Sequence, residues 1–185
     1  MTRKNSPQYA DDDYESVGTL FKLRAPTLAI GLILGIGISL ATASFEDVLA
    51  RDVRVAFFLP FIIYIADAIG TQTEAIYSRD LRTGRAIFKN YFRKELSLGL
   101  IFGLIFGLVS GGIAWWWLRD YQLSLSVAIA CFLTITTAPI VALSVAHLFQ
   151  CIHKDPAAGT GPIATVLQDM ISVVIYGVVT SLIIL

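Results

Sequence analysis

The chain has 185 residues, of which 56% are hydrophobic and only 15% are charged, and its mean hydropathy is +0.71. A soluble domain of this size is far less apolar, so we predict an all-α integral membrane protein. The formal net charge is zero, which argues against a nucleic-acid partner.

Five apolar segments are long enough to cross a hydrocarbon core of about 30 Å as helices. They cover approximately residues 25–45, 55–78, 95–118, 123–151 and 162–185. We expect polar connections between them, the most basic at 79–94. The sequence thus predicts two parts, a polar and acidic N-terminal arm at 1–23 and a five-helix transmembrane domain at 24–185.

The distribution of basic residues predicts the orientation in the membrane. If the connections alternate between the two sides, eleven of the 14 Lys and Arg residues lie on the side of the N-terminus. Because Lys and Arg gather on the cytoplasmic side, we expect a multi-pass protein of the cell membrane with its N-terminus in the cytoplasm and its C-terminus outside. We also expect the basic connection to contact membrane lipid headgroups.

The third span carries glycine at every fourth position, at Gly99, Gly103, Gly107 and Gly111. Residues at this spacing share one face of a helix, and small residues there let another helix approach with backbone contact. We therefore expect a second helix to pack along this row.

The last span contains one carboxylate, Asp169, roughly a third of the way across the membrane. An acid near the centre of a lipid-facing helix costs about 2.5–3.5 kcal/mol, so Asp169 is expected to face protein, water or an ion. Thr165 and Ser172 are four residues before it and three after it, on the same helix face. We predict that this face lines a cation path.

The second span is polar along one side, because Asp67, Thr71 and Glu74 recur at helical spacing and Gln72 lies beside them. The fourth span contributes the hydroxyl of Thr137. Together with Ser172, the residues Thr71, Gln72 and Thr137 are candidates for lining the pore. The alternative for each hydroxyl is a structural bond to its own backbone, which is common in membrane helices.

Three acids lie inside the predicted spans, Asp67, Glu74 and Asp169, and no Lys or Arg accompanies them. The compensating positive charge is expected from a metal cation or from protons. Mg²⁺ keeps several of its waters and is bound by oxygen ligands, whereas Cys and His, which suit softer metals, are scarce in the spans. We predict Mg²⁺ as the bound and transported ion, with Asp169, Thr165, Asp67 and Glu74 as candidate ligands.

A homodimer is expected because five spans are few to enclose a pore and an odd number cannot form two equal repeats. A two-fold axis would supply Asp169 twice. No nucleophile and base stand at a plausible spacing, so we do not expect an enzyme.

The sequence also resembles a known family. The run DPAAGTGPIATVLQD at Asp155–Asp169, continuing into Ile175–Tyr176, is similar to the last helix of the MgtE magnesium transporters and their eukaryotic solute-carrier relatives. Pro60 followed by Gly70–Gln72 and Arg79–Leu81 is similar to the second helix of that family. The likeness covers most of residues 25–185.

This resemblance implies a homodimer of five-helix protomers around a central pore, with Asp169 as the main ligand of hydrated Mg²⁺ and the backbone near Thr165 in the filter. The chain differs from the family where Ala66–Ala68 replaces Gly-Gly-Asn, so that an amide is missing and the carboxylate of Asp67 is present. The large cytoplasmic regulatory domains of many bacterial members have no counterpart in this sequence. Gating by internal Mg²⁺ is therefore expected to differ, to be lost, or to come from another chain.

Several alternatives stay open at this stage. The chain is a Mg²⁺-preferring channel or transporter, a carrier coupled to protons or Na⁺, or a non-transporting membrane subunit that docks a partner. Asp169 and Asp67 could instead be buried acids with a structural role. Glu74 could instead face Arg79 or a neighbouring basic residue.

Overall fold

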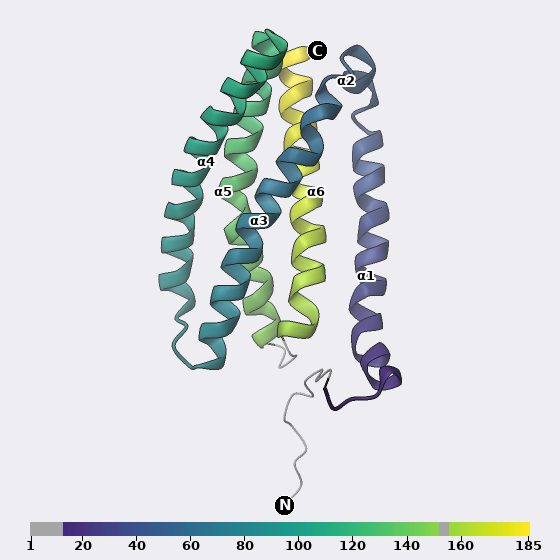
Figure 1. Cartoon of the computed structure of the whole chain (residues 1–185), viewed down its shortest axis with the longest axis vertical. Helices are drawn as coiled ribbons and strands as arrows, with labels where there is room; N and C mark the ends of the chain where they lie inside the picture. The colour runs from purple at the N-terminus through teal and green to yellow at the C-terminus, as the bar shows by residue number, and fades with distance from the viewer. Residues whose placement is uncertain (1–12, 152–155) are drawn as a thin grey trace, which may run out of the picture.

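The computed structural model of the chain describes residues 13–151 and 156–185, and all regular structure within them is helical. The five long helices run side by side, and the first turn of α1 and the last turn of α6 lie at opposite ends (Figure 1). The helices are α1 (Val17–Ala43), α2 (Glu46–Arg51), α3 (Val55–Arg82), α4 (Phe88–Leu118), α5 (Tyr121–Cys151) and α6 (Pro156–Ile184).

Five of these helices are long and apolar enough to cross a membrane, which confirms the predicted number of spans. Their predicted bounds were too short, because α1 begins at Val17, α3 continues to Arg82, α4 begins at Phe88 and α6 begins at Pro156. Hydropathy detects only the part of a helix that crosses hydrocarbon, whereas these helices continue into polar sequence. The basic connection is consequently reduced to a turn at 83–87.

The loop predicted between the first two spans contains the short helix α2. Its first turn holds Glu46 and Asp47 and its last turn holds Arg51. Acids at the N-terminus and a base at the C-terminus complement the helix dipole. The charges that suggested a loop therefore also suit a surface helix.

Helix α5 is the centre of the bundle. It packs against α3, α4 and α6, and its buried residues run along its whole length. Helices α4 and α1 lie at the two edges (Figure 1). Helix α1 packs mainly against α6 and has no buried residue.

The glycine row of α4 faces α5, as predicted. A Cβ atom added at Gly103 would lie 2.8 Å from the carbonyl oxygen of Phe132, and one at Gly107 would lie 2.8 Å from that of Ala128. The hydroxyl of Thr136 donates to the carbonyl oxygen of Gly99 at 3.3 Å. Backbone contact of this kind leaves no room for a side chain on α4.

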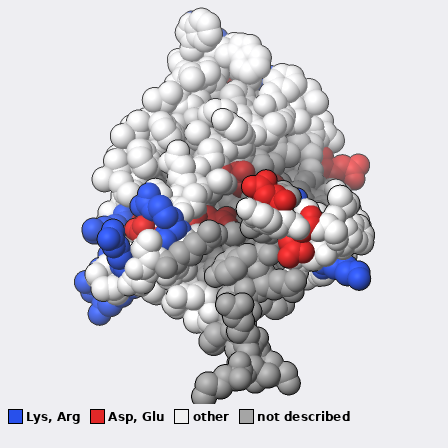
Figure 2. Space-filling model, turned by 60° about the horizontal axis from the view of Figure 1, so that its bottom comes forward, with Lys and Arg blue, Asp and Glu red and all other residues white. Residues whose placement is uncertain are grey.

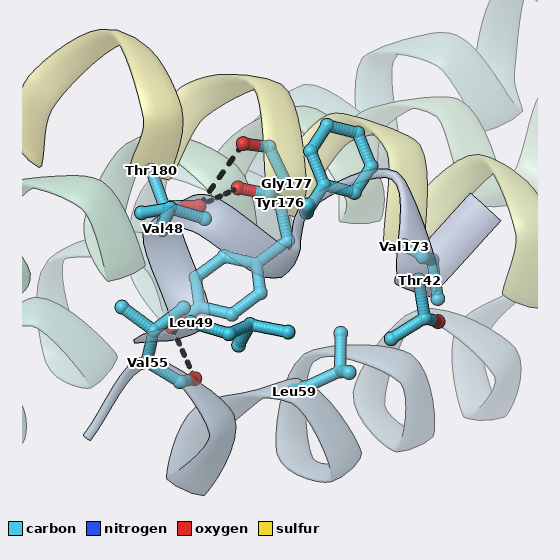
Figure 3. Close-up of a pocket in the computed structure, with 10 residues that line it drawn as sticks. Thr42, Val48, Leu49, Val55, Leu59, Val173, Tyr176, Gly177 and Thr180 are labelled. Atoms are coloured by element: carbon cyan, nitrogen blue, oxygen red, sulfur yellow. Dashed lines mark hydrogen bonds between the residues drawn. The ribbon is translucent and has the colours of Figure 1, made fainter. Parts of the chain in front are cut away.

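Two contacts connect α6 to the part of the chain around α2. One is made by Phe45, which precedes α2, and the other by Tyr176 of α6. The ring of Phe45 lies against Gly177, where an added Cβ atom would overlap the ring. The hydroxyl of Tyr176 donates to the carbonyl oxygen of Val55 at 2.8 Å, across an apolar pocket (Figure 3). These contacts fix one end of α6 relative to α3.

An ion cluster joins the beginning of α3 to the turn between α4 and α5. The guanidinium of Arg54 donates to Asp52 and to Asp120, with shortest distances of 2.8 and 2.7 Å. The side chain of Arg54 holds the pKa of Asp52 below its ordinary value. The backbone N–H of Leu123, and after it Arg54, lowers the pKa of Asp120.

We predict that Gly107→Ala destabilises the protein by about 1–3 kcal/mol, because the new methyl group meets the backbone of Ala128. Gly112→Ala is the matched control, since an added Cβ there meets nothing within 4 Å. The measurement is the melting temperature of each purified variant in detergent. Equal melting temperatures would contradict the close contact between α4 and α5.

Acid should weaken the cluster formed by Arg54. Both carboxyl pKa values are lowered in the folded protein, so the stabilisation is complete above the unfolded pKa of about 3.9 and disappears as the pH falls through the folded values. We expect Arg54→Gln to lower the melting temperature at pH 7 and to flatten its decline below pH 4. Arg51→Gln, at the same end, is the control, and identical pH curves for the two variants would contradict the prediction.

Candidate functional site

A polar pocket lies where α3, α5 and α6 meet. Its empty volume is about 190 Å³. Four of its lining residues are among those predicted from the sequence as ligands or pore residues: Asp67, Thr71, Glu74 and Thr165. The fold thus brings the polar side of the second span onto the last span.

Small residues of α5 let α3 approach closely enough to form this pocket. A Cβ atom at Gly70 would lie 3.5 Å from the carbonyl oxygen of Ala138 and 3.7 Å from the Cβ of Ala142. Asp67 and Glu74 stand one turn to either side of Gly70, so both are directed to the same pocket. The Oε1 atom of Glu74 is 3.9 Å from the Cβ position of Gly161, at the beginning of the membrane part of α6.

Asp169 lies beside the pocket without being one of its lining residues. Its side chain is partly buried, and its Oδ1 atom is buried with no hydrogen-bond partner in the described structure. The carboxylate of Asp67 is near enough to act on it electrostatically. The negative charges of two acids, one on α3 and one on α6, therefore repel each other, and a bound cation would relieve that repulsion.

Sequence analysis missed Gln168, which lines the pocket from α6. Its Nε2 atom donates to Ser172 at 3.3 Å and to the carbonyl oxygen of Thr134 at 3.5 Å. Its Oε1 atom is buried without a partner among the described residues. The spacing of Gln168 and Ser172, four residues apart in a span, was the available indication of a polar pair.

The other predicted pore residues take different positions. Ser172 is fully buried and accepts the bond from Gln168. Thr137 donates to the carbonyl oxygens of Leu133 and Thr134 on its own helix. Gln72 is exposed and does not line the pocket. Their roles in a pore stay predictions.

A further acid, Glu95, was missed because it stands where the third span was expected to begin. In the structure it lies well inside α4, and its carboxylate accepts the hydroxyl of Thr73 on α3 at 2.7 Å. Nearby, the hydroxyl of Tyr77 and Nδ1 of His147 are 3.0 Å apart, and His147 stacks on Phe88. These contacts join the same ends of α3, α4 and α5.

Within residues 13–151 and 156–185, no three His, Cys, Asp or Glu side chains are grouped to hold a metal ion. The pocket instead presents two carboxylates, two threonines and an amide. Such a set suits an ion that keeps much of its water better than a closed cage.

These features define a multi-pass helical membrane protein whose spans carry acids around a polar pocket. A family model described as "MgtE: Divalent cation transporter" matches residues 59–179. The match covers more than half of the chain, and the chain belongs to the MgtE family. This confirms the resemblance found in the sequence and the localisation to a membrane, and the family consists of transporters rather than enzymes.

Three curated relatives carry the name magnesium transporter MgtE. The protein of Bacillus subtilis is 28% identical over 94% of this chain and 42% of its own length. Those of Enterococcus faecalis and Thermus thermophilus are 27% and 26% identical, over 86% and 85% of this chain. The chain spans between 35% and 42% of the length of these relatives.

We predict that Asp169→Asn leaves the melting temperature in EDTA unchanged or raises it. The substitution replaces a partly buried carboxylate, which has one unpartnered oxygen in the described structure and lies near a second acid, with a neutral amide of the same shape. It therefore removes a costly negative charge and its repulsion by Asp67. Asp80→Asn is the matched control, because Asp80 accepts bonds from Arg79 and from the hydroxyl of Tyr91, so its replacement should lower the melting temperature. An equal loss in both variants would make Asp169 a structural acid.

Proposed function

We propose that this chain moves divalent cations, with a preference for Mg²⁺, across the membrane along the polar pocket between α3 and α6. The observation that carries the proposal is the polar pocket that Asp67 and Glu74 of α3 share with Thr165 of α6, one helical turn before Asp169. The names of the family and of its curated relatives support the same cargo.

The chemistry of the pocket favours a hydrated cation. The pocket offers only oxygen atoms as metal ligands. They belong to the carboxylates of Asp67 and Glu74, the hydroxyl groups of Thr71 and Thr165, and the amide of Gln168. Mg²⁺ exchanges its waters reluctantly, and contacts through water need only a few fixed oxygens along the path. The buried Oε1 atom of Gln168 has no other partner in the described structure and is well placed as one of them.

Asp169 is proposed as the central ligand, supplied twice in a homodimer. In the described part of one chain, no three acidic, His or Cys side chains are grouped closely enough to hold a metal ion. A second copy related by a two-fold axis would double the carboxylates without a new element. Val174, Val178 and Leu182 are exposed along one face of α6, which leaves that face open to such a contact.

The orientation follows from the basic residues, with the N-terminus in the cytoplasm and the C-terminus outside. In that orientation the membrane potential drives a divalent cation inward, with about 2.3 kcal/mol for each charge and each 100 mV. The beginning of α6, where Glu74 lies near Gly161, then forms the cytoplasmic mouth. The protein is bound by membrane lipid along its exposed apolar helices.

The test is Mg²⁺ uptake into liposomes that contain only this protein, with an imposed membrane potential. We expect wild-type uptake to follow the potential, and uptake by Asp169→Ala and Asp169→Asn to fall at least about tenfold, since a cation crossing the region loses its main charge partner. Asp47→Asn is the matched control. It removes an exposed acid on α2, which lies at the end of the bundle opposite the beginning of α6 (Figure 1), and should keep wild-type uptake.

Two outcomes would contradict the proposal. Uptake that requires a pH or Na⁺ gradient rather than a potential would indicate a coupled carrier. Folded wild-type protein without any flux would indicate a docking subunit, or a transporter that needs the remaining length present in the relatives.

A further inference from the structure

A second polar pocket lies at the turn between α3 and α4. It is lined by Arg85, Ile87, Asn90, Tyr91, Lys94 and Glu95. The space between its lining atoms, part of which is open solvent, is about 570 Å³, three times that of the pocket between α3 and α6. Most of the basic side chains at this end of the molecule form one group on the left of Figure 2, and a smaller basic group lies on the right, near acidic side chains.

The cations around this turn have no ion-pair partners within the described part of the chain. Arg85, Lys89, Arg93 and Lys94 are exposed there and form no ion pair. The backbone N–H of Arg85 donates to the carbonyl oxygen of Asp80 at 3.0 Å. Its guanidinium is near enough to the Asp80 carboxylate to act on it electrostatically, but it forms no ion pair with it. The turn therefore carries positive charge that the described residues do not neutralise.

The acids near the pocket are already occupied by donors of the same chain. Asp80 accepts a bond from Arg79 at 2.9 Å and another from the hydroxyl of Tyr91. Glu95 accepts the hydroxyl of Thr73 at 2.7 Å. These bonds tie the acids to α3 and α4 and leave Arg85 and Lys94 to face an external anion.

An exposed apolar row continues from the pocket along α4. Leu98, Ile101 and Ile105 follow Lys94 at four, seven and eleven residues, on one face of the helix. Their exposed fractions are 42%, 54% and 49%. A cationic pocket at the end of a membrane helix, continued by an apolar stripe, has the pattern of a phospholipid headgroup and its acyl chain.

We propose that this pocket binds the phosphate of an anionic phospholipid, with Arg85 and Lys94 as its charge partners and the α4 row along an acyl chain. The apolar row distinguishes a lipid from free phosphate, which would use only the two cations. The inference is independent of the proposed transport function, because it concerns a separate pocket and requires no divalent cation.

The test is lipid retention by the whole purified chain, measured by native mass spectrometry in EDTA with phosphatidylglycerol or phosphatidylcholine. We expect wild type to retain phosphatidylglycerol in preference. Arg85→Gln/Lys94→Gln should weaken that retention roughly tenfold, since both charges facing the phosphate are removed. The single variant Lys94→Gln should give an intermediate loss, and it provides a second measurement if the double variant does not fold.

Lys89→Gln/Arg93→Gln is the matched control, with the same change of charge at the same end but outside the pocket lining. We expect less than about a threefold loss for it, because neither side chain faces the phosphate. An equal loss in the two double variants, or equal retention of the two lipids by wild type, would overturn the proposal. Displacement of phosphatidylglycerol by equimolar soluble glycerol phosphate would overturn it as well, because the site would then select free phosphate.

Discussion

The cost of placing a carboxylate among apolar helices is the constraint on which this structure depends. Asp67, Glu74 and Asp169 each lie within a helix that is otherwise suited to hydrocarbon. Such acids are tolerated where they face protein, water or an ion. The fold meets this requirement by turning the polar side of α3 toward α6 and closing the space with small residues of α5.

Close helix packing is therefore part of the site and not only of the scaffold. The glycines of α4 bring it into backbone contact with α5, and Gly70 of α3 packs at ordinary contact distance against Ala138 and Ala142 of α5. Helices α3 and α6 both pack against α5, and the polar pocket lies where the three helices meet. A larger residue at Ala138 or Ala142 of α5 would push Gly70 of α3 away and fill part of the pocket.

The number of spans, the packing of the glycine row and the membrane acids were all predictable from the sequence, because each depends on local composition or on helical spacing. The rotation of each helix was not. Ser172 shares a face with Asp169 by spacing, yet at about 100° for each residue it lies about 60° away, toward Gln168. The structure shows that this side of α6 packs against α5, so Ser172 is buried while Asp169 is partly accessible.

The ends of the helices and the polar contacts between helices could not be predicted from the sequence either. The hydrophobic pattern stops where hydrocarbon stops, so it did not show that α4 begins at Phe88 and includes Glu95. The bond between Glu95 and Thr73 depends on the position of two separate helices, which a single sequence does not report. The same holds for Gln168, whose importance comes from the residues around it.

Locating the ion would test the central claim most directly. Mn²⁺ can replace Mg²⁺ at oxygen sites and scatters anomalously, so a structure of the protein with Mn²⁺ would place the cation. We expect an anomalous peak between Asp169 and the pocket of Asp67 and Thr165. Peaks only at exposed acids such as Glu46 and Asp47, with none near Asp169, would contradict the account.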